Sequence, residues 1–395
     1  MEAGSRGGNR YPFSFTGKGG EYFKIWIVNI ILTILTLYIY SAWAKVRNKR
    51  YFHGNTILDG SGFDYHAKPL QILLSRLVAA ALLIAVTLGS YLHALIPLIS
   101  TIVLVVIVPW ALWRSIKFNA RMTSYRNVRF GFNGPLKWMY IFQFLLPLLP
   151  IALFGGAGAF VLATSDDSMN ELGGALIAVG VFVSILLAPW IQKLMSSYIL
   201  NHYQYGKSQF SATLSTGRFY AILILAVLLG LLSLIIVGAV IVVIGYLSGL
   251  ISMDVIEVLG SDKPEDALSG VFVLGIVAFY VAMFTIGFFF TAYVRARLRM
   301  HTFSRALLDR RVSFESTVTS RGLWWVLFSN FLITVFTLGL GIPFAKVRLA
   351  RYLANNTVAY AEEPLDQFVG EKREEVGAFG DELGDAFDMD MDVGF

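Results

Sequence analysis

The chain has 395 residues, of which 56% are hydrophobic and 15% are charged, and its mean hydropathy is +0.65. Soluble domains carry about 25% charged residues, so this composition indicates a membrane protein. The absence of cysteine excludes disulfides, thiol nucleophiles and cysteine-held metals. The net charge of +6 conceals an acidic end, because residues 361–395 hold 12 Asp and Glu against 2 Lys and Arg. The basic remainder lies beside apolar segments, which favours anionic lipid over nucleic acid as a partner.

Eight apolar segments have about the 20 residues that a bilayer crossing needs. They are 23–43, 70–92, 95–114, 138–164, 173–193, 219–249, 269–294 and 323–343. The loops 44–69, 114–137, 193–218 and 295–322 hold 21 Lys and Arg, whereas the connections between the other ends of the middle segments hold only Lys263. By the positive-inside rule, the four basic loops face the cytoplasm. This rule orients the six middle segments as crossings.

The two terminal apolar segments belong to one duplicated sequence. Residues 29–56 and 330–357 align without a gap at an offset of 301, with twelve of 28 positions identical. The identities include Asn, Thr, Lys and Arg, which a shared apolar composition cannot place in register. We infer an internally duplicated membrane protein. If each copy crosses, both chain ends lie outside and there are eight spans. If each copy dips in and returns, both ends lie inside and there are six, and Gly339, Gly341 and Pro343 favour such a break.

The basic loops share a short pattern that predicts β-hairpins. Alternating apolar residues flank Asp59-Gly60, Gly206-Lys207 and Asp309-Arg310, and such dipeptides favour tight turns. The N-terminal stretch carries only the second half of this unit, with Phe13 matching Phe314 at the offset of 301, and residues 356–360 carry only the first half. We therefore expect the two ends to meet beside the other hairpins.

The chain resembles the YjgN-like family of bacterial inner-membrane proteins of unknown function. The resemblance rests on FTGKGGEYFKIWIVN (15–29), TILTLYIYSAWAKVRNKRYFHGNT (33–56), TLGLGIPFAKVRLARYLANNT (337–357) and GDELGDAFDMDMDVGF (380–395). It implies a multipass protein of the bacterial cytoplasmic membrane. It implies no reaction and no ligand.

Two groups of duplicated residues are candidate binding residues. The polar stripe Asn29, Thr33 and Thr36 recurs as Asn330, Thr334 and Thr337, each on one helix face that should turn away from lipid. The stripe either forms hydrogen bonds between helices or makes a paired polar site between the two copies. We expect Asn29 and Asn330 to lie close together. The basic residues Lys45, Arg47 and Arg50 recur as Lys346, Arg348 and Arg351. They either orient the segments at the interface or bind anionic lipid or ligand.

Catalysis is not expected. The five histidines form no metal-binding motif, there is no GxSxG or P-loop, and no carboxylate lies inside an apolar segment. We predict no catalytic residue, metal or cofactor. Residues 361–395 have the composition of a disordered tail, in which Phe379, Leu383 and Phe387 are spaced for a short acidic helix.

These patterns predict an all-α polytopic membrane protein built as a duplicated helix bundle. It has six spans, two duplicated terminal segments that span or re-enter, and small cytoplasmic β-hairpins. Residues 1–22 form a polar N-terminal segment, 23–360 the membrane domain and 361–395 the tail. One functional hypothesis is a carrier or channel for a small solute or lipid, with its site between the copies. The other is a non-catalytic scaffold that binds anionic lipid or a protein through the basic face and acidic tail. A protein partner or homo-oligomer is left open.

Overall fold

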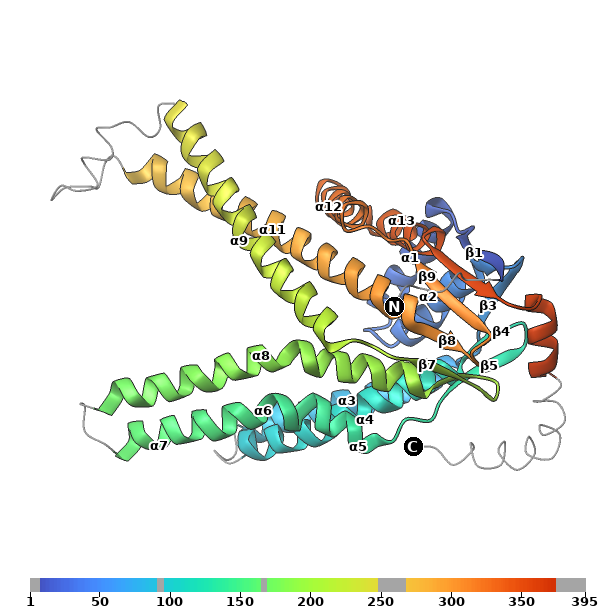
Figure 1. Ribbon diagram of the computed structural model, residues 1–395, viewed down its shortest axis with the longest axis horizontal. Helices are drawn as coiled ribbons and strands as arrows, with labels where there is room; N and C mark the ends of the chain where they lie inside the picture. The colour runs from blue at the N-terminus through green and yellow to red at the C-terminus, as the bar shows by residue number, and fades with distance from the viewer. Residues whose placement is uncertain (1–7, 91–95, 165–168, 248–267, 374–395) are drawn as a thin grey trace. The chain divides into compact units, whose positions relative to one another are not determined.

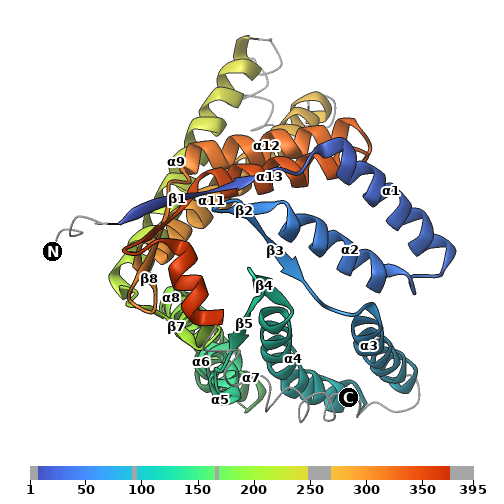
Figure 2. The same ribbon diagram turned by 90° about the vertical axis from the view of Figure 1, so that its right-hand side faces the viewer.

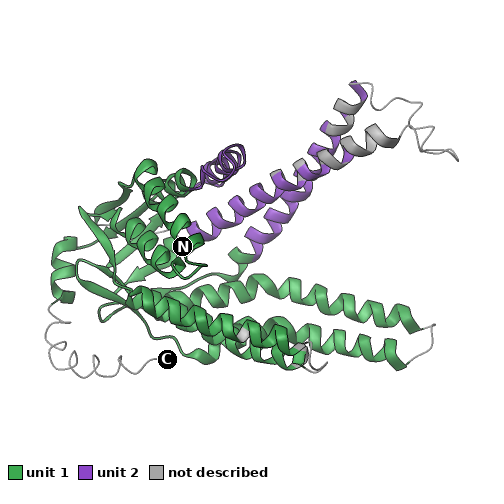
Figure 3. Ribbon diagram, turned by 180° about the vertical axis from the view of Figure 1, so that it is seen from behind, with its two compact units in different colours: residues 1–219, 301–317, 343–395 green, residues 220–300, 318–342 purple. Residues whose placement is uncertain are grey.

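The computed structural model describes residues 8–90, 96–164, 169–247 and 268–373. The chain divides into two compact units, coloured separately in Figure 3. The first comprises residues 1–219, 301–317 and 343–395, and the second comprises 220–300 and 318–342.

Ten antiparallel strands close into a barrel in the first unit (Figure 1). Their order around the barrel is β1-β10-β9-β8-β7-β6-β5-β4-β3-β2. The strands are β1 (Asn9–Phe15), β2 (Thr56–Leu58), β3 (Ser61–Tyr65), β4 (Thr123–Tyr125), β5 (Val128–Phe132), β6 (Tyr203–Tyr205), β7 (Ser208–Ala212), β8 (Ala306–Leu308), β9 (Val312–Ser316) and β10 (Thr357–Ala361).

Four tight hairpins supply eight of these strands, and all three predicted turns are present. Asp59, Gly60 and Gly206 adopt positive φ in their turns, as do Asp309 and Arg310, which suits the twist of a two-residue hairpin. The predicted small hairpins are therefore confirmed on a mostly helical protein, but the all-α class does not include the closed barrel that they form. Each hairpin also pairs with its neighbours, because an isolated hairpin is barely stable in water and leaves unpaired edges.

The fifth strand pair joins the two ends of the chain. In the register of β1 and β10, Tyr11 faces Ala359 and Pro12 faces Val358. The predicted meeting of the two ends beside the hairpins is therefore confirmed. This pairing closes the barrel, since β1 also pairs with β2 and β10 with β9.

Two rings of side chains fill the barrel. One phenylalanine from each odd-numbered strand forms the first ring: Phe13, Phe63, Phe130, Phe210 and Phe314. Ring centroids are 6.3 Å apart between Phe63 and each of Phe13 and Phe130, with stacked planes. The third residue of each even-numbered strand forms the second ring: Leu58, Tyr125, Tyr205, Leu308 and Ala359. Small barrels are normally filled by side chains in this way.

The two tyrosines of the second ring tie neighbouring hairpins together. The Tyr125 hydroxyl donates to the Leu58 carbonyl at 2.7 Å, and the Tyr205 hydroxyl donates to the Tyr125 carbonyl at 3.0 Å. Burial raises the pKa of Tyr125 to about 12, so this phenol keeps its donor proton at neutral pH. The hydroxyls of both tyrosines are thus satisfied within the mainly apolar barrel core.

A short helix at residues 365–373 covers the hairpin-turn end of the barrel, where it is drawn in red (Figure 2). Leu365, Phe368 and Val369 are buried in the barrel core. Lys372 is only 5% exposed and pairs with Asp309 at 2.9 Å. This hydrogen-bonded ammonium lowers the pKa of the Asp309 carboxyl.

Further ion pairs hold the same helix on the turns. Arg126 pairs with Asp366, and Arg311 pairs with Glu371 at 2.9 Å. The beginning of the acidic tail is therefore an ordered cover on the barrel. The helix predicted around Phe379, Leu383 and Phe387 lies outside the described residues.

A pair of helical arms connects each odd-numbered strand to the even-numbered strand that follows it. In chain order the helices are α1 (Gly19–Leu35), α2 (Ser41–Gly54), α3 (Pro69–Ser90), α4 (Ile96–Arg121), α5 (Leu136–Tyr140), η1 (Ile141–Leu145), α6 (Leu146–Pro150), η2 (Ile151–Gly155), α7 (Gly156–Thr164), α8 (Asn170–His202), α9 (Thr216–Leu247), α11 (Leu268–Arg305), α12 (Ser320–Phe336) and α13 (Ile342–Asn355). The chain is thus five β–helical arm–β units in series.

Five helical segments in the described part of the chain are long and apolar enough to cross a membrane. They are Pro69–Gly89, Ile99–Arg121, Leu136–Thr164, Asn170–His202 and Thr216–Val240. The sixth predicted span, 269–294, falls within α11. The span Leu136–Thr164 includes two π-helical turns, η1 and η2, which periodicity does not reveal. Pro150 directly precedes η2 and lacks the N–H that a regular α-helix needs there.

The duplicated segments bend back instead of crossing. The first is interrupted between α1 and α2 by Leu37 and Tyr38, both with positive φ. Its ends join β1 and β2, which pair with each other. The second is interrupted at Leu338 and Gly339, also with positive φ, and its ends join the paired strands β9 and β10. The re-entrant alternative is therefore the one that the structure supports.

The break provides a test of backbone strain. Gly339 has φ +91°, where a side chain is strained, whereas its counterpart Tyr38 bears a side chain at φ +74°. We expect Gly339→Ala to lower the free energy of unfolding by about 1 kcal/mol, and Tyr38→Gly to leave it unchanged or raise it. Thermal unfolding in detergent measures both. Equal melting of Gly339→Ala and the unaltered protein would contradict the assigned break.

Candidate functional site

The first polar stripe links the two arms of its own re-entrant segment. Asn29 is 3% exposed, and its Nδ2 atom donates to Asn48 Oδ1 at 3.0 Å. Asn29 Oδ1 is buried without a hydrogen-bond partner among the described residues. The Asn29 amide nitrogen is therefore held by Asn48, while its amide oxygen can still accept a hydrogen bond.

The last threonine of each stripe forms hydrogen bonds at the helix break. Thr36 Oγ1 donates to the Leu32 carbonyl and accepts from the Tyr40 amide at 2.9 Å. Thr337 Oγ1 makes the same pair of bonds, to the Ile333 carbonyl and from the Gly341 amide. The repeated threonines therefore satisfy backbone groups that the break releases. This structural role explains their identity in both copies without a ligand.

Thr33 and Thr334 also bond within their own helices. Thr33 Oγ1 donates to the Asn29 carbonyl at 2.6 Å, and Thr334 Oγ1 donates to the Asn330 carbonyl at 2.8 Å. Asn330 is buried in the second unit, at 8% exposure, and Asn29 in the first. The proximity of the two asparagines stays a prediction.

A pocket of about 420 Å³ opens beside Asn29. Its polar lining comes from Asn29, Thr33 and Asn48 of the first copy and Lys346 of the second, and its apolar lining includes Trp26 and Tyr38. The two copies also pack together, with Val347 of α13 in one cluster with Tyr51 and Phe52 of α2. The structure thus brings three of the predicted binding residues, Asn29, Thr33 and Lys346, to one pocket.

The basic residues of the two copies divide into two kinds. Arg50 donates to the carbonyls of Tyr65, the last residue of β3, and Ala67. Arg351 donates to the Gly17 carbonyl, just after β1. Each arginine thereby fixes the start of the next helical arm. Lys45, Arg47 and Lys346 are exposed, and Arg348 is half-buried. Arg50 and Arg351 are exposed too, so their hydrogen bonds to backbone carbonyls, and not burial, set them apart from Lys45, Arg47 and Lys346.

The repeated Asn-Thr pair is also structural. Thr16 bonds to the carbonyl and side chain of Asn55, at 3.0 and 3.1 Å, and Thr317 bonds likewise to Asn356, at 3.0 and 3.2 Å. These contacts join each helical arm to the strand beside it. Much of the duplicated motif therefore preserves the arm-to-barrel junction.

Sequence reasoning missed Asn48 and Trp26 as pocket residues. The repeat carries no signal for Asn48, because its counterpart is Leu349. Trp26 is one apolar residue among many in α1. Only the return of α2 alongside α1 reveals that they share a pocket. Within the described ranges, no group of three His, Asp or Glu side chains lies together as a metal site.

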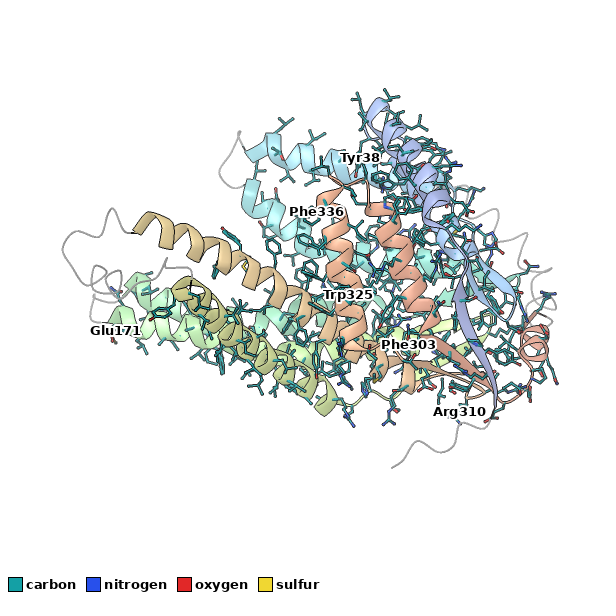
Figure 4. All side chains as sticks on the ribbon, turned by 90° about the horizontal axis from the view of Figure 1, so that it is seen from above. Tyr38, Glu171, Phe303, Arg310, Trp325 and Phe336 are labelled. Carbon is teal, nitrogen blue, oxygen red and sulfur yellow. The ribbon has the colours of Figure 1, made fainter. Side chains whose placement is uncertain are left out.

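Two labelled residues mark the opposite ends of the first unit. Glu171 lies at the far end of α8 from the barrel, whereas Arg310 lies on a barrel turn (Figure 4). Long apolar helices that leave a closed strand barrel define a polytopic α-helical membrane protein with a β-barrel.

The chain belongs to the family described as bacterial protein of unknown function (DUF898), whose model matches residues 10–386. It is 29% identical over 369 residues to the inner membrane protein YjgN of Salmonella typhimurium, covering 89% of each chain. It is 30% identical over 357 residues to the inner membrane protein YjgN of Escherichia coli O157:H7, covering 88% of each. No solved structure matches. The predicted family and inner-membrane location are confirmed.

Proposed function

We propose that this protein is a carrier for a small anionic amphiphile, such as a lipid, which it holds in the pocket between the two duplicated segments. The observation that carries the proposal is the composition of that pocket. Asn29, Asn48 and Lys346 offer amide groups and a cation, while Trp26 and Tyr38 offer aromatic surface. An anionic headgroup with an attached apolar chain has the complementary chemistry.

The barrel favours a carrier over an open channel. Its interior is filled by the two side-chain rings, and the helix at 365–373 covers one end. A solute passing along the barrel axis would have to displace this core. The pocket instead lies beside α1, where Ile34 and Leu37 are strongly exposed, at 69% and 89%. Such exposed apolar side chains are suited to contact with lipid. A lipid would therefore enter the pocket from the membrane and not along the barrel axis.

Lipid movement in reconstituted vesicles tests the proposal. Vesicles containing fluorescent phosphatidylglycerol are treated with dithionite, which bleaches only the outer leaflet. With the unaltered protein, dithionite should also bleach the fluorescent lipid of the inner leaflet, because the protein moves this lipid to the outer leaflet. Asn29→Leu and Lys346→Gln should abolish this exposure, because each removes a polar group from the pocket. Lys24→Gln is the matched control, since Lys24 is exposed on the same helix outside the pocket lining.

Stability measurements separate a binding role from a structural one. Losing the Asn29–Asn48 bond should lower stability by about 1–2 kcal/mol, leaving most protein folded at 25 °C. If folded Asn29→Leu protein still moves lipid at the unaltered rate, the pocket is not the site. Absence of protein-dependent bleaching for phosphatidylglycerol and for other anionic lipids would refute the carrier.

A non-catalytic scaffold is the second candidate. The ion pairs of Arg126 with Asp366 and of Arg311 with Glu371 support it, because in both an acidic side chain of the C-terminal helix lies on a basic residue of a barrel turn. In this alternative, lipids and a protein partner bind without transport, and nucleic acid is not a ligand. Lipid retained by the purified protein without any transbilayer movement would favour the scaffold.

A further inference from the structure

A second pocket, of about 560 Å³, lies on the outside of the barrel and gathers four basic residues. Lys117 and Arg121 come from the last turns of α4, Arg129 from β5 and Lys207 from the turn between β6 and β7. None of the residues lining this pocket is acidic. We name Lys117, Arg121, Arg129 and Lys207 the barrel-wall basic cluster. It is distinct from the pocket between the duplicated segments.

The convergence of these charges has an electrostatic cost. Lys117 and Arg121 lie four residues apart on one helix face, where like charges repel. Arg129 and Lys207 bring two further cations from different elements to the same hollow. Both side chains are exposed. An anion of more than one charge would relieve the repulsion and accept several charge-assisted hydrogen bonds at once.

Neutral donors complete the hollow. Asn133 and Gln204 line it beside the cluster. Gly131 permits the close approach of Gln204, since a Cβ at residue 131 would lie 2.5 Å from Gln204 Nε2. Amide N–H groups beside guanidinium groups are the usual donors to phosphate oxygens. The donor set thus suits a compact polyoxyanion better than a single carboxylate.

Aromatic residues place the pocket at the membrane interface. The Lys117 ammonium lies 4.8 Å from the centre of the Trp113 ring, and Trp113 Nε1 donates to the Gly134 carbonyl at 2.6 Å. Nearby, the Lys137 ammonium lies 5.6 Å from the Trp138 ring centre. Trp rings with Lys and Arg at helix ends mark the headgroup layer of a bilayer. This pattern favours a position of the cluster near the layer of lipid phosphates.

We propose that the barrel-wall basic cluster binds a phosphate group that carries more than one negative charge. A phosphomonoester has a charge of about −1.5 to −2 at pH 7, whereas a phosphodiester has one. Arg121 and Arg129 are the residues that fork onto its oxygens, with Lys117 and Lys207 as flanking point charges. The phosphate belongs either to a lipid headgroup or to a soluble ligand.

Binding of defined probes to the full chain in zwitterionic nanodiscs tests this proposal. The probes are phosphatidic acid, which is a phosphomonoester, phosphatidylglycerol, which is a phosphodiester, and inorganic pyrophosphate. The unaltered protein should prefer phosphatidic acid over phosphatidylglycerol by about tenfold in affinity. The pair Arg121→Gln and Arg129→Gln should remove that preference. The control pair Arg10→Gln and Lys68→Gln removes two exposed cations elsewhere and should retain it.

Pyrophosphate separates the two sources of the phosphate. Displacement of phosphatidic acid by pyrophosphate at comparable affinity indicates a soluble phosphate ligand, whereas retention of the lipid indicates a headgroup. The proposal is overturned if the Arg121/Arg129 variant binds phosphatidic acid like its control, or if the unaltered protein treats monoester and diester alike. The preference for the monoester depends on Arg121 and Arg129, whereas lipid movement in the carrier proposal depends on Asn29 and Lys346, so the two proposals fail in separate measurements.

Discussion

A chain that ends at residue 356 should fail to accumulate as a folded membrane protein. This truncation removes β10 and the helix at 365–373, and leaves β1 and β9 as unpaired edges. It also removes Ala359, Leu365 and Phe368 from the barrel core. Each large side chain withdrawn from such a core costs about 2 kcal/mol, and the lost strand pairing adds to this. The total is comparable to the whole stability of a domain, about 5–15 kcal/mol.

Two longer truncations are the controls for this experiment. A chain ending at residue 373 keeps every described element and should be recovered at the level of the full chain. A chain ending at residue 363 keeps β10 but loses the barrel cover, and should fold with a clearly lower melting temperature. Fluorescence-detected size-exclusion chromatography measures all three. Full recovery of the chain ending at 356 would refute the closed barrel as the organising element.

Thiol labelling from the periplasmic side should modify Glu171→Cys and spare cysteines on the barrel. The chain has no native cysteine, so each introduced thiol reports alone. Glu171 lies at the distal end of α8, while Arg10 and Asn127 belong to the barrel. Since the arms leave and re-enter one barrel, every barrel residue should lie on the same membrane face. The positive-inside rule makes that face cytoplasmic.

The expected labelling difference is all or none in intact cells. An impermeant maleimide should reach Arg10→Cys and Asn127→Cys only after the membrane is opened. Leu37→Cys, 89% exposed at the re-entrant break, should stay unlabelled in both conditions if it faces acyl chains. Periplasmic labelling of Arg10→Cys would restore the eight-span alternative for the first segment. Periplasmic labelling of Asn127→Cys would reverse the whole orientation.

Only part of the candidate site could be predicted from the sequence. The duplication pointed to Asn29 and Lys346, because identity at polar positions is visible in one chain. The same signal also marked Thr36, Arg50 and Asn55, whose contacts are with backbone groups at breaks and junctions. A repeat preserves whatever the local fold needs, so it does not distinguish a ligand contact from a structural one. Asn48, present in one copy, gave no signal at all.

The sequence by itself determined the membrane class, most of the helical spans, three of the four hairpin turns and the register between the two copies. These properties are local, since apolar length, charge near helix ends and turn residues act over a few neighbours. Tertiary structure alone decided that the hairpins share one barrel and that the duplicated segments return to it. Strand pairing such as Tyr11 with Ala359 joins residues nearly the whole chain apart. Its stabilisation comes from closing every edge at once, which no single segment encodes.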